Sequence, residues 1–162
     1  SIDAVSLQVE LDMCRNYIEL QGVGQDHKPQ LVLNTDDKIM SVKVPPISIL
    51  TLVENCCKYG VMQDRVLTVT IDASVRTFNE DKFVYIVVKD NGPGFSENIL
   101  QFLNSDISRL AVDGHVGINN VMTRMKMMYG NDCSMIFDNA DGACIYIIIP
   151  VKEDDYETVN SR

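Results

Sequence analysis

The sequence predicts an α/β (α+β) two-layer sandwich, in which a mixed, mostly antiparallel sheet is covered by helices on one face. Apolar residues recur at helical spacing in three segments, at residues 6–21, 46–59 and 117–129. Runs rich in β-branched and aromatic residues fall between these segments, and turn-forming residues separate two pairs of runs as in hairpins. Strands and helices alternate irregularly along the chain, an order that fits an antiparallel or mixed sheet.

The composition indicates one globular domain. At 162 residues the chain is long enough for a single well-buried core. Its hydrophobic content of 46% is ordinary for a globular protein, and no apolar run approaches the length of a membrane span. The net charge of −9 argues against a nucleic-acid-binding surface. We therefore expect no contact with nucleic acid and no membrane contact by this part of the protein.

The cysteines predict a reduced protein. The chain has five, at positions 14, 56, 57, 133 and 144, and they form no CxxC pair and no zinc-ligand spacing. Their odd count and their places on apolar faces predict buried, reduced thiols, a pattern typical of cytosolic proteins. A reactive redox thiol is the alternative.

The first third of the chain predicts a helix, a linker and a hairpin. Residues 6–21 carry two adjacent apolar stripes, so the helix either packs wholly on its own domain or is the tail of a dimerisation helix that begins upstream. Residues 22–29 form a polar linker with Gly22 and Gly24, and His27 in it is expected to be solvated. Strands at 30–34 and 39–44 are expected to pair around a turn at 35–38.

The helix expected at 46–59 carries the first group of candidate functional residues. Pro46 fits the first turn of a helix, and Gly60 fits a stop at positive φ. Residues three and four apart share a face, so Asn55 and Lys58 line up with Thr51, with Glu54 beside them and Tyr59 at the edge. An amide oxygen can ligate a hard cation and an ammonium can neutralise a phosphate. The alternative is an ordinary solvated polar face.

A buried strand at 83–89 leads into the second group, Asp90, Gly92 and Gly94. A strand at 66–71, with a possible extension to Phe78, precedes it and turns at 79–82. A carboxylate at a buried strand end needs hydrogen-bond donors, and the amine of adenine would supply one. The glycines allow backbone to approach a ligand closely. The alternative is a plain turn in which Asp90 caps the next helix.

The remaining chain predicts a lid, a phosphate-binding helix and a final hairpin. A short helix at 97–103 is followed by residues 104–114, which we read as a mobile lid, with a plain surface loop as the alternative. Arg109 is the only Arg or Lys between Lys89 and Arg124, so it is the one cationic side chain that this lid could offer to a ligand. The helix at 117–129 begins at Gly117, where unpaired N–H groups favour phosphate. Strands at 133–138 and 143–149 are joined by a turn at 139–142.

Three short motifs in this order resemble the GHKL ATP-binding fold. Glu54-Asn55-x-x-Lys58-Tyr59-Gly60 resembles its N box, Asp90-x-Gly92-x-Gly94 its first glycine box, and Gly117-Ile118-x-Asn120-Val121 its second. The likeness is closest to the catalytic domains of YesM/LytS-like bacterial sensor histidine kinases. Leu7-x-x-Glu10-Leu11 with Tyr17 resembles the helix that leads into those domains, and Arg124-Met125-x-x-x-Tyr129-Gly130 resembles the segment after their second glycine box. The resemblance covers about residues 6–150.

The resemblance implies the Bergerat/GHKL fold, with ATP and Mg²⁺ as cofactors. Asn55 would hold the metal, Asp90 would accept from the adenine amine, and Tyr59 would pack on the ring. Glu54 would polarise the incoming nucleophile, although an ion pair with Lys58 is an equal account. The implied catalytic residues are Glu54, Asn55 and Lys58, and the implied nucleotide-binding residues are Asn55, Lys58, Tyr59, Asp90, Gly92, Gly94, Arg109, Gly117, Ile118 and Asn120.

The resemblance also implies a place in a larger protein. Residues 1–22 would lead in from a dimerisation and phosphoacceptor region, residues 23–151 would form the ATP-binding catalytic domain, and residues 152–162 an acidic, disordered tail. The domain would donate the γ-phosphoryl group to a histidine outside it. It would lie in the cytosol as part of a dimeric inner-membrane receptor that acts on a response regulator.

Four departures from the family pattern keep other readings open. The second glycine box has His115-Val116 in place of a further glycine, Ala143 stands where a hydroxyl is usual, Leu50 replaces a polar residue, and the linker lacks the usual Arg and aromatic. A degenerate domain that acts as a nucleotide-sensing or dimerisation scaffold is therefore the main alternative. Another GHKL ATPase is a third reading, but the chain is too short to hold the extra domains of such relatives.

Overall fold

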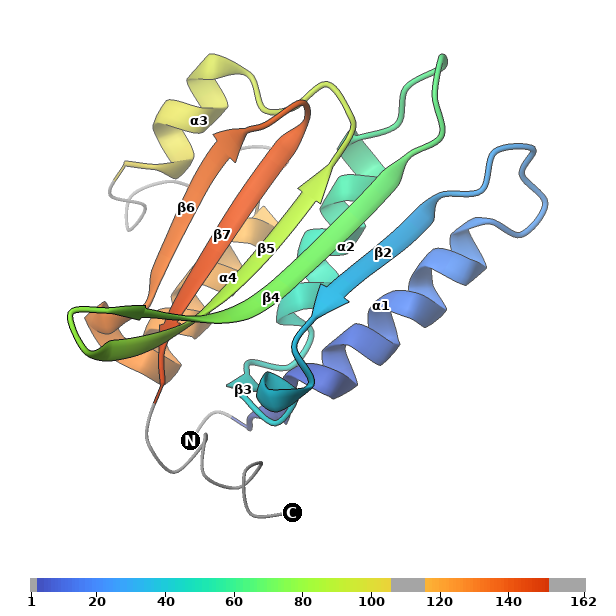
Figure 1. Cartoon of the computed structure of the whole chain (residues 1–162). Helices are drawn as coiled ribbons and strands as arrows, with labels where there is room; N and C mark the ends of the chain where they lie inside the picture. The colour runs from blue at the N-terminus through green and yellow to red at the C-terminus, as the bar shows by residue number, and fades with distance from the viewer. Residues whose placement is uncertain (1–2, 106–115, 152–162) are drawn as a thin grey trace.

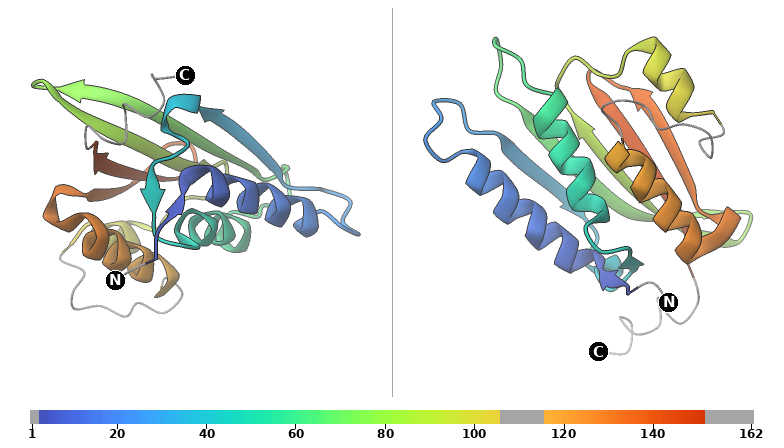
Figure 2. Two further views of the ribbon diagram at one scale, coloured as in Figure 1. Left: turned by 90° about the horizontal axis from the view of Figure 1, so that it is seen from below. Right: turned by 180° about the vertical axis from the view of Figure 1, so that it is seen from behind.

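The computed structural model describes residues 3–105 and 116–151, which form one mixed sheet with helices on one face (Figure 1; Figure 2, left). The predicted two-layer sandwich is confirmed. The five-stranded sheet has the order β2-β4-β5-β7-β6, and a separate two-stranded sheet joins β1 and β3. In chain order the elements are β1 (Val5–Ser6), α1 (Leu7–Gln21), β2 (Gln30–Thr35), η1 (Asp37–Ile39), β3 (Lys43–Val44), α2 (Ser48–Tyr59), β4 (Thr68–Phe78), β5 (Asp81–Asp90), α3 (Glu97–Leu103), α4 (Val116–Tyr129), η3 (Gly130–Asp132), β6 (Ser134–Asn139) and β7 (Ala143–Pro150).

The pairing of the strands corrects one prediction. β2 and β3 do not form a hairpin. β2 runs parallel to β4, in the register Gln30↔Thr68, whereas β3 pairs with β1, in the register Val5↔Val44. Asp36 caps the short helix η1 by accepting from the Lys38 N–H. The chain after this helix meets the start of α1, where the Leu7 and Gln8 N–H groups donate to the carbonyls of Val42 and Met40. All other neighbours in the large sheet are antiparallel.

The predicted extension of the strand at 66–71 to Phe78 is confirmed. β4 and β5 pair from Val69↔Asp90 to Phe78↔Asp81 and form a long hairpin that reaches beyond the end of β2 (Figure 1). Asn79 and Glu80 form its turn with φ of 48° and 71°, the left-handed geometry of a two-residue hairpin loop.

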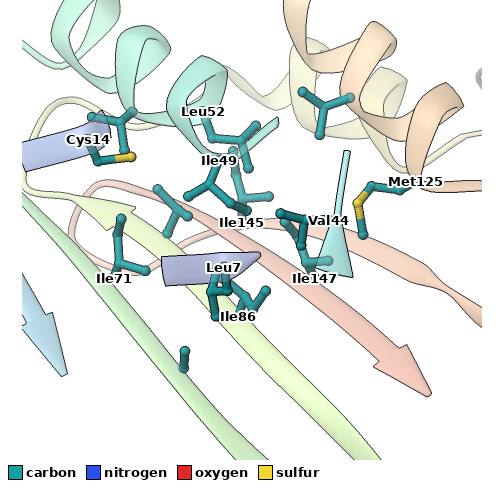
Figure 3. Close-up of a cluster of buried hydrophobic side chains, with 14 of the residues drawn as sticks. Leu7, Cys14, Val44, Ile49, Leu52, Ile71, Ile86, Met125, Ile145 and Ile147 are labelled. Atoms are coloured by element: carbon teal, nitrogen blue, oxygen red, sulfur yellow. The ribbon is translucent and has the colours of Figure 1, made fainter. Parts of the chain in front are cut away.

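The core lies between the sheet and helices α1, α2 and α4. Leu7, Ile49, Leu52, Ile86 and Ile147 point into it from both layers (Figure 3). Burial of such side chains is the main stabilising contribution in a domain of this size. Among the described helices, none is long and apolar enough to cross a membrane.

Helix α1 buries one of its two apolar stripes fully and the other only in part. Leu7, Leu11, Cys14 and Ile18 are in the core, whereas Val9 is 45% exposed and Leu20 is 70% exposed. Tyr17, from the same stripe as Val9 and Leu20, is half-buried against the core, so both readings of this helix stay open.

The start and stop of α2 differ from the prediction. Pro46 lies before the helix instead of in its first turn, because the helix begins at Ser48 after Ile47, whose φ of 64° is left-handed. Gly60 ends the helix with φ −89°, so no positive φ is needed there. A side chain at Gly60 is excluded by packing instead, since an added Cβ would lie 2.5 Å from the Cys56 carbonyl oxygen.

The five cysteines are free and, apart from half-buried Cys57, all are buried, as predicted. Burial raises the pKa of Cys14 from 9.0 to about 12 and the pKa values of Cys57 and Cys133 to about 11. Burial also raises the pKa of Cys56 well above 9.0. These four thiols are therefore protonated at neutral pH, which makes them poor nucleophiles.

This protonation predicts slow alkylation. At pH 8 we expect iodoacetamide to modify the native protein at least ~10-fold more slowly than the urea-unfolded protein, as read by mass spectrometry. The folded pKa values of these thiols lie above their ordinary value of 9.0. The stabilisation that comes from keeping the thiols protonated in the fold is therefore fully present below pH 9. It is lost as the pH rises through 11 to 12, so the free energy of unfolding should fall there. Rapid modification of the folded protein at pH 8 would contradict this account.

Candidate functional site

A cavity of about 260 Å³ opens between α2, the adjoining ends of β5 and β7, and the first residues of α3 and α4. Its walls are mainly apolar, with a few polar side chains that converge on it, as in most small-molecule sites. The lining residues are Leu52, Asn55, Cys56, Tyr59, Gly60, Val88, Asp90, Gly94, Phe95, Ser96, Ile99, Ile118, Ala143 and Ile145.

Among the described residues, Asp90 is the one acidic side chain in these walls. It is 8% exposed at the end of β5, and its Oδ1 accepts from the backbone N–H of Gly92 at 2.9 Å and of Ala143 at 3.1 Å. The Cys56 thiol is buried beside this side chain, and the neighbouring carboxylate adds to the effect of burial in raising the pKa of the thiol. A carboxylate has about four acceptor sites, so Asp90 keeps capacity for a donor on a ligand.

Close backbone packing explains the glycine after Asp90. Gly92 is buried, and a Cβ on it would lie 2.5 Å from both the Cα and the carbonyl oxygen of Gly60. The turn after β5 therefore packs directly on the end of α2. Gly92 does not line the cavity, and its position indicates a role in packing.

Gly94 lies at the cavity wall with φ +79°. The side chain of Asn139, at the end of β6, holds the next residue by two hydrogen bonds. Its Oδ1 accepts from the Phe95 N–H at 2.8 Å, and its Nδ2 donates to the Phe95 carbonyl at 2.9 Å. A Cβ on Gly94 would meet this amide at 2.6 Å, so the glycine is required for the clamp.

Only some residues of the predicted polar face of α2 lie at the cavity. Half-buried Asn55 and the ring of Tyr59 line the cavity, whereas Glu54 and Lys58 are exposed and do not. The Lys58 Nζ lies 5.2 Å from the centre of the Tyr59 ring. Within the described chain, no ion pair joins Glu54 and Lys58, so the pairing offered as an alternative for Glu54 does not form.

Helix α4 brings the second glycine box to the same region. Ile118 is buried and lines the cavity. Gly117 packs on α2, because an added Cβ would lie 3.0 Å from Thr51 Cγ2 and 3.7 Å from Asn55 Nδ2. Asn120 is exposed and does not line the cavity. Arg109 and His115 fall outside the described residues.

Three contributions were not predicted from the sequence. Cys56 faces Asp90, Asn139 clamps the segment after the glycines, and Ala143 holds Asp90 through its backbone N–H although it lacks the hydroxyl usual in the family. Asn91 was not predicted either. Its side chain accepts from the Thr68 N–H and donates to the Val66 carbonyl, which fixes the turn after β5 to the start of β4. No local sequence pattern distinguishes these roles from those of ordinary turn and core residues.

The fold is an α/β sandwich with helices on one face of a mixed sheet, and its cavity is lined by a strand-end carboxylate and a helix amide. The family described as histidine kinase-, DNA gyrase B-, and HSP90-like ATPase matches residues 48–153, more than half of the chain. The chain belongs to this family, and the resemblance drawn from the three boxes is confirmed. Membership in a family of ATPases implies that ATP is the nucleotide bound.

Known relatives point in the same direction. The sensor histidine kinase/phosphatase LytS of Staphylococcus aureus strain MRSA252 is 27% identical over 154 residues, which cover 94% of this chain and 26% of that protein. The chain thus spans about a quarter of the length of the curated relatives that it matches.

Solved structures share the fold. The histidine kinase domain of the Erythrobacter litoralis EL346 blue-light activated histidine kinase superposes with a TM-score of 0.64 at 15% identity, covering 99% of this chain and 69% of that one. The mycobacterial sensor histidine kinase MprB gives a TM-score of 0.62 at 13% identity, covering 93% and 97%.

Proposed function

We propose that the chain is the ATP-binding catalytic domain of a two-component sensor histidine kinase, which donates the γ-phosphoryl group of ATP to a histidine outside it. The observation that carries this proposal is that Asp90 and Asn55 line one cavity. The match of the family to residues 48–153 and the similarity to LytS support it.

In this proposal Asp90 recognises the adenine base of ATP. Its carboxylate is held by two backbone N–H groups and accepts from the exocyclic amine of adenine. The apolar walls formed by Leu52, Ile118 and Ile145 enclose the ring, and Tyr59 packs at its edge. Apolar walls with one fixed polar group give both affinity and orientation.

Asn55 fits a role in holding Mg²⁺. An amide oxygen is a hard ligand suited to this ion. Among residues 3–105 and 116–151, no three acidic, histidine or cysteine side chains gather into a metal site. The protein would thus supply few ligands, which agrees with the preference of Mg²⁺ for waters and substrate phosphates as the rest of its shell. When bound, the ion would neutralise charge on the phosphates.

Lys58 and Glu54 would act at the rim of the cavity. Both side chains are exposed beside Asn55 on α2, so they are accessible to a phosphate tail or to an incoming acceptor. Gly117 would present backbone N–H groups to the phosphates, with Ile118 and Asn120 in the same box, and Arg109 would reach the γ-phosphate. Phosphoryl transfer depends mainly on positioning and charge neutralisation, which these groups would supply on the donor side.

The wider assembly follows from the same proposal. Residues 1–22 would lead in from a dimerisation and phosphoacceptor region, residues 23–151 would form the catalytic domain, and residues 152–162 an acidic tail. The full protein would be a dimer that acts on a response regulator, with this domain in the cytosol.

Two observations favour the scaffold alternative. Lys58 and Glu54 do not line the cavity, and the cavity volume of about 260 Å³ is below the ~300–1,000 Å³ typical of ligand pockets. A domain that binds nucleotide without turnover, or not at all, would fit these features.

Calorimetry with Mg-ATP distinguishes the two functions. We expect saturable binding with a dissociation constant below ~1 mM, since the cavity offers one ionic acceptor and an apolar enclosure. Transfer of ³²P from ATP to a separately supplied dimerisation region that carries the acceptor histidine would then establish kinase activity. Absence of binding at millimolar Mg-ATP would support the scaffold, and binding without transfer would support a nucleotide sensor.

A further inference from the structure

Glu10 is a fully buried carboxylate that lies outside the cavity. It belongs to α1, is 0% exposed, and faces the first turn of α2. Its Oε2 accepts from the Ile47 N–H at 3.0 Å, and its Oε1 accepts from the N–H groups of Ile49 at 3.0 Å and Leu50 at 3.3 Å. One side chain of α1 thus satisfies three backbone donors at the start of another helix.

Helix α2 has no cap of its own at this end. Its N-cap position is Ile47, which makes no side-chain capping hydrogen bond. The first N–H groups of a helix need partners and carry a positive dipole end, and the Glu10 carboxylate meets both needs. The start of α2 is therefore fixed by α1 instead of by its own sequence.

The backbone at this point is strained. Ile47 has φ 64° and ψ 17°, a left-handed conformation that is a genuine outlier for a β-branched residue. Such a conformation persists only when the surroundings hold it. Besides Glu10, the Arg124 guanidinium of α4 donates to the Pro46 carbonyl, and the Thr51 hydroxyl of α2 donates to the Ile47 carbonyl at 2.6 Å. Helices α1, α2 and α4 therefore meet at residues 46–47.

This bend is connected to the two walls of the cavity that α2 and α4 form. Helix α2 carries Asn55 and Tyr59, and α4 carries Ile118 and packs through Gly117 against Thr51 and Asn55. Asp90 instead belongs to β5, which is fixed between two other strands of the sheet. Because a helix moves nearly as a rigid body, a shift at its first turn changes the position of Asn55 relative to Asp90.

We propose that Glu10 is a positioning residue for the nucleotide site, through which the location of α1 sets the separation of Asn55 and Asp90. The inference rests on the proposed function. Displacement of α1 along or away from α2 would remove three hydrogen bonds from the strained bend, release the first turn of α2 and weaken nucleotide binding. The packing of α1 on the domain would thereby control the affinity for nucleotide, although α1 itself would not contact the nucleotide.

The test compares Glu10→Gln with Val84→Ala in the full chain, by Mg-ATP calorimetry at 15 °C and by thermal unfolding. Val84 is a buried residue of β5 that lies outside the cavity, so its truncation lowers Tm without disturbing the bend. We expect Glu10→Gln to weaken Mg-ATP binding about 10-fold, because small misplacements of binding groups have large effects. Val84→Ala should bind within about twofold of the wild type.

A second readout does not depend on nucleotide. In the free protein, Glu10→Gln should shift the side-chain amide signal of Asn55 in ¹H–¹⁵N spectra, and Val84→Ala should not. If Glu10→Gln does not fold, Thr51→Val serves in its place, since it removes one restraint on Ile47 and keeps the side-chain shape.

The outcomes separate the two proposals. Failure of the wild type to bind Mg-ATP rejects the proposed function and the inference that rests on it, whatever the spectra show. Wild-type binding with unchanged affinity and an unchanged Asn55 signal in Glu10→Gln rejects the positioning role alone. Equal loss of affinity in Val84→Ala also rejects it, because the effect would then follow stability and not the bend.

Discussion

Asp90→Asn is expected to abolish measurable Mg-ATP binding, a loss of at least ~100-fold. The replacement keeps an acceptor oxygen for the Gly92 and Ala143 N–H groups, so the turn should remain folded. Its new NH₂ group, however, would face the adenine amine, which leaves two donors opposed in a buried site. Sites built to recognise a ligand N–H discriminate strongly against a mismatch of this kind.

Two controls make this result specific. Asp72→Asn is the matched variant, because Asp72 lies on the neighbouring strand β4 between buried Ile71 and Ala73, on the opposite face of the sheet. It should bind Mg-ATP like the wild type. Inosine triphosphate has an acceptor in place of the amine, so the wild type should reject it. Equal affinity for Mg-ATP and inosine triphosphate in calorimetry would show that Asp90 does not recognise the adenine amine.

Gly92→Ala is expected to have the largest effect on stability. Its Cβ would lie 2.5 Å from two backbone atoms of Gly60, which cannot move without displacing the end of α2. We expect a loss of about 3 kcal/mol or more in the free energy of unfolding, together with weaker Mg-ATP binding, because the turn carrying Asp90 packs on this contact. Thermal unfolding followed by circular dichroism measures the first effect.

Gly24→Ala is the control for conformational preference without a clash. Gly24 has φ +75° with no atom within 4 Å of an added Cβ, so only backbone strain is introduced. That variant should lose about 1 kcal/mol and keep its affinity for Mg-ATP. A Gly92→Ala protein as stable as Gly24→Ala would show that the contact of Gly92 with Gly60 is not a tight one.

Local patterns predicted the elements of the fold well. The short helix at 97–103 has the bounds Glu97–Leu103 in the structure, and the long hairpin reaches Phe78 as its alternation indicated. These elements depend on periodicity and turn chemistry within a few residues. The meeting of Asn55 and Asp90 at one cavity was predicted from the family resemblance of the boxes and not from spacing.

The errors concern long-range pairing. Residues 30–34 and 39–44 look like a hairpin locally, but β2 pairs with β4 some 38 positions away in the chain (Gln30↔Thr68). Gly60 was assigned to a positive φ, whereas packing against the Cys56 carbonyl oxygen and the Leu67 side chain excludes a side chain there. The capping of α2 by Glu10 joins residues 37 to 40 positions apart, so no local pattern could reveal it.

The most direct test of the account is a crystal structure with a non-hydrolysable Mg-ATP analogue. The account predicts the adenine amine within hydrogen-bond distance of an Asp90 carboxylate oxygen, and the metal on the amide oxygen of Asn55, in one bound nucleotide. A nucleotide seated elsewhere, or one that touches only one of these two side chains, would contradict it.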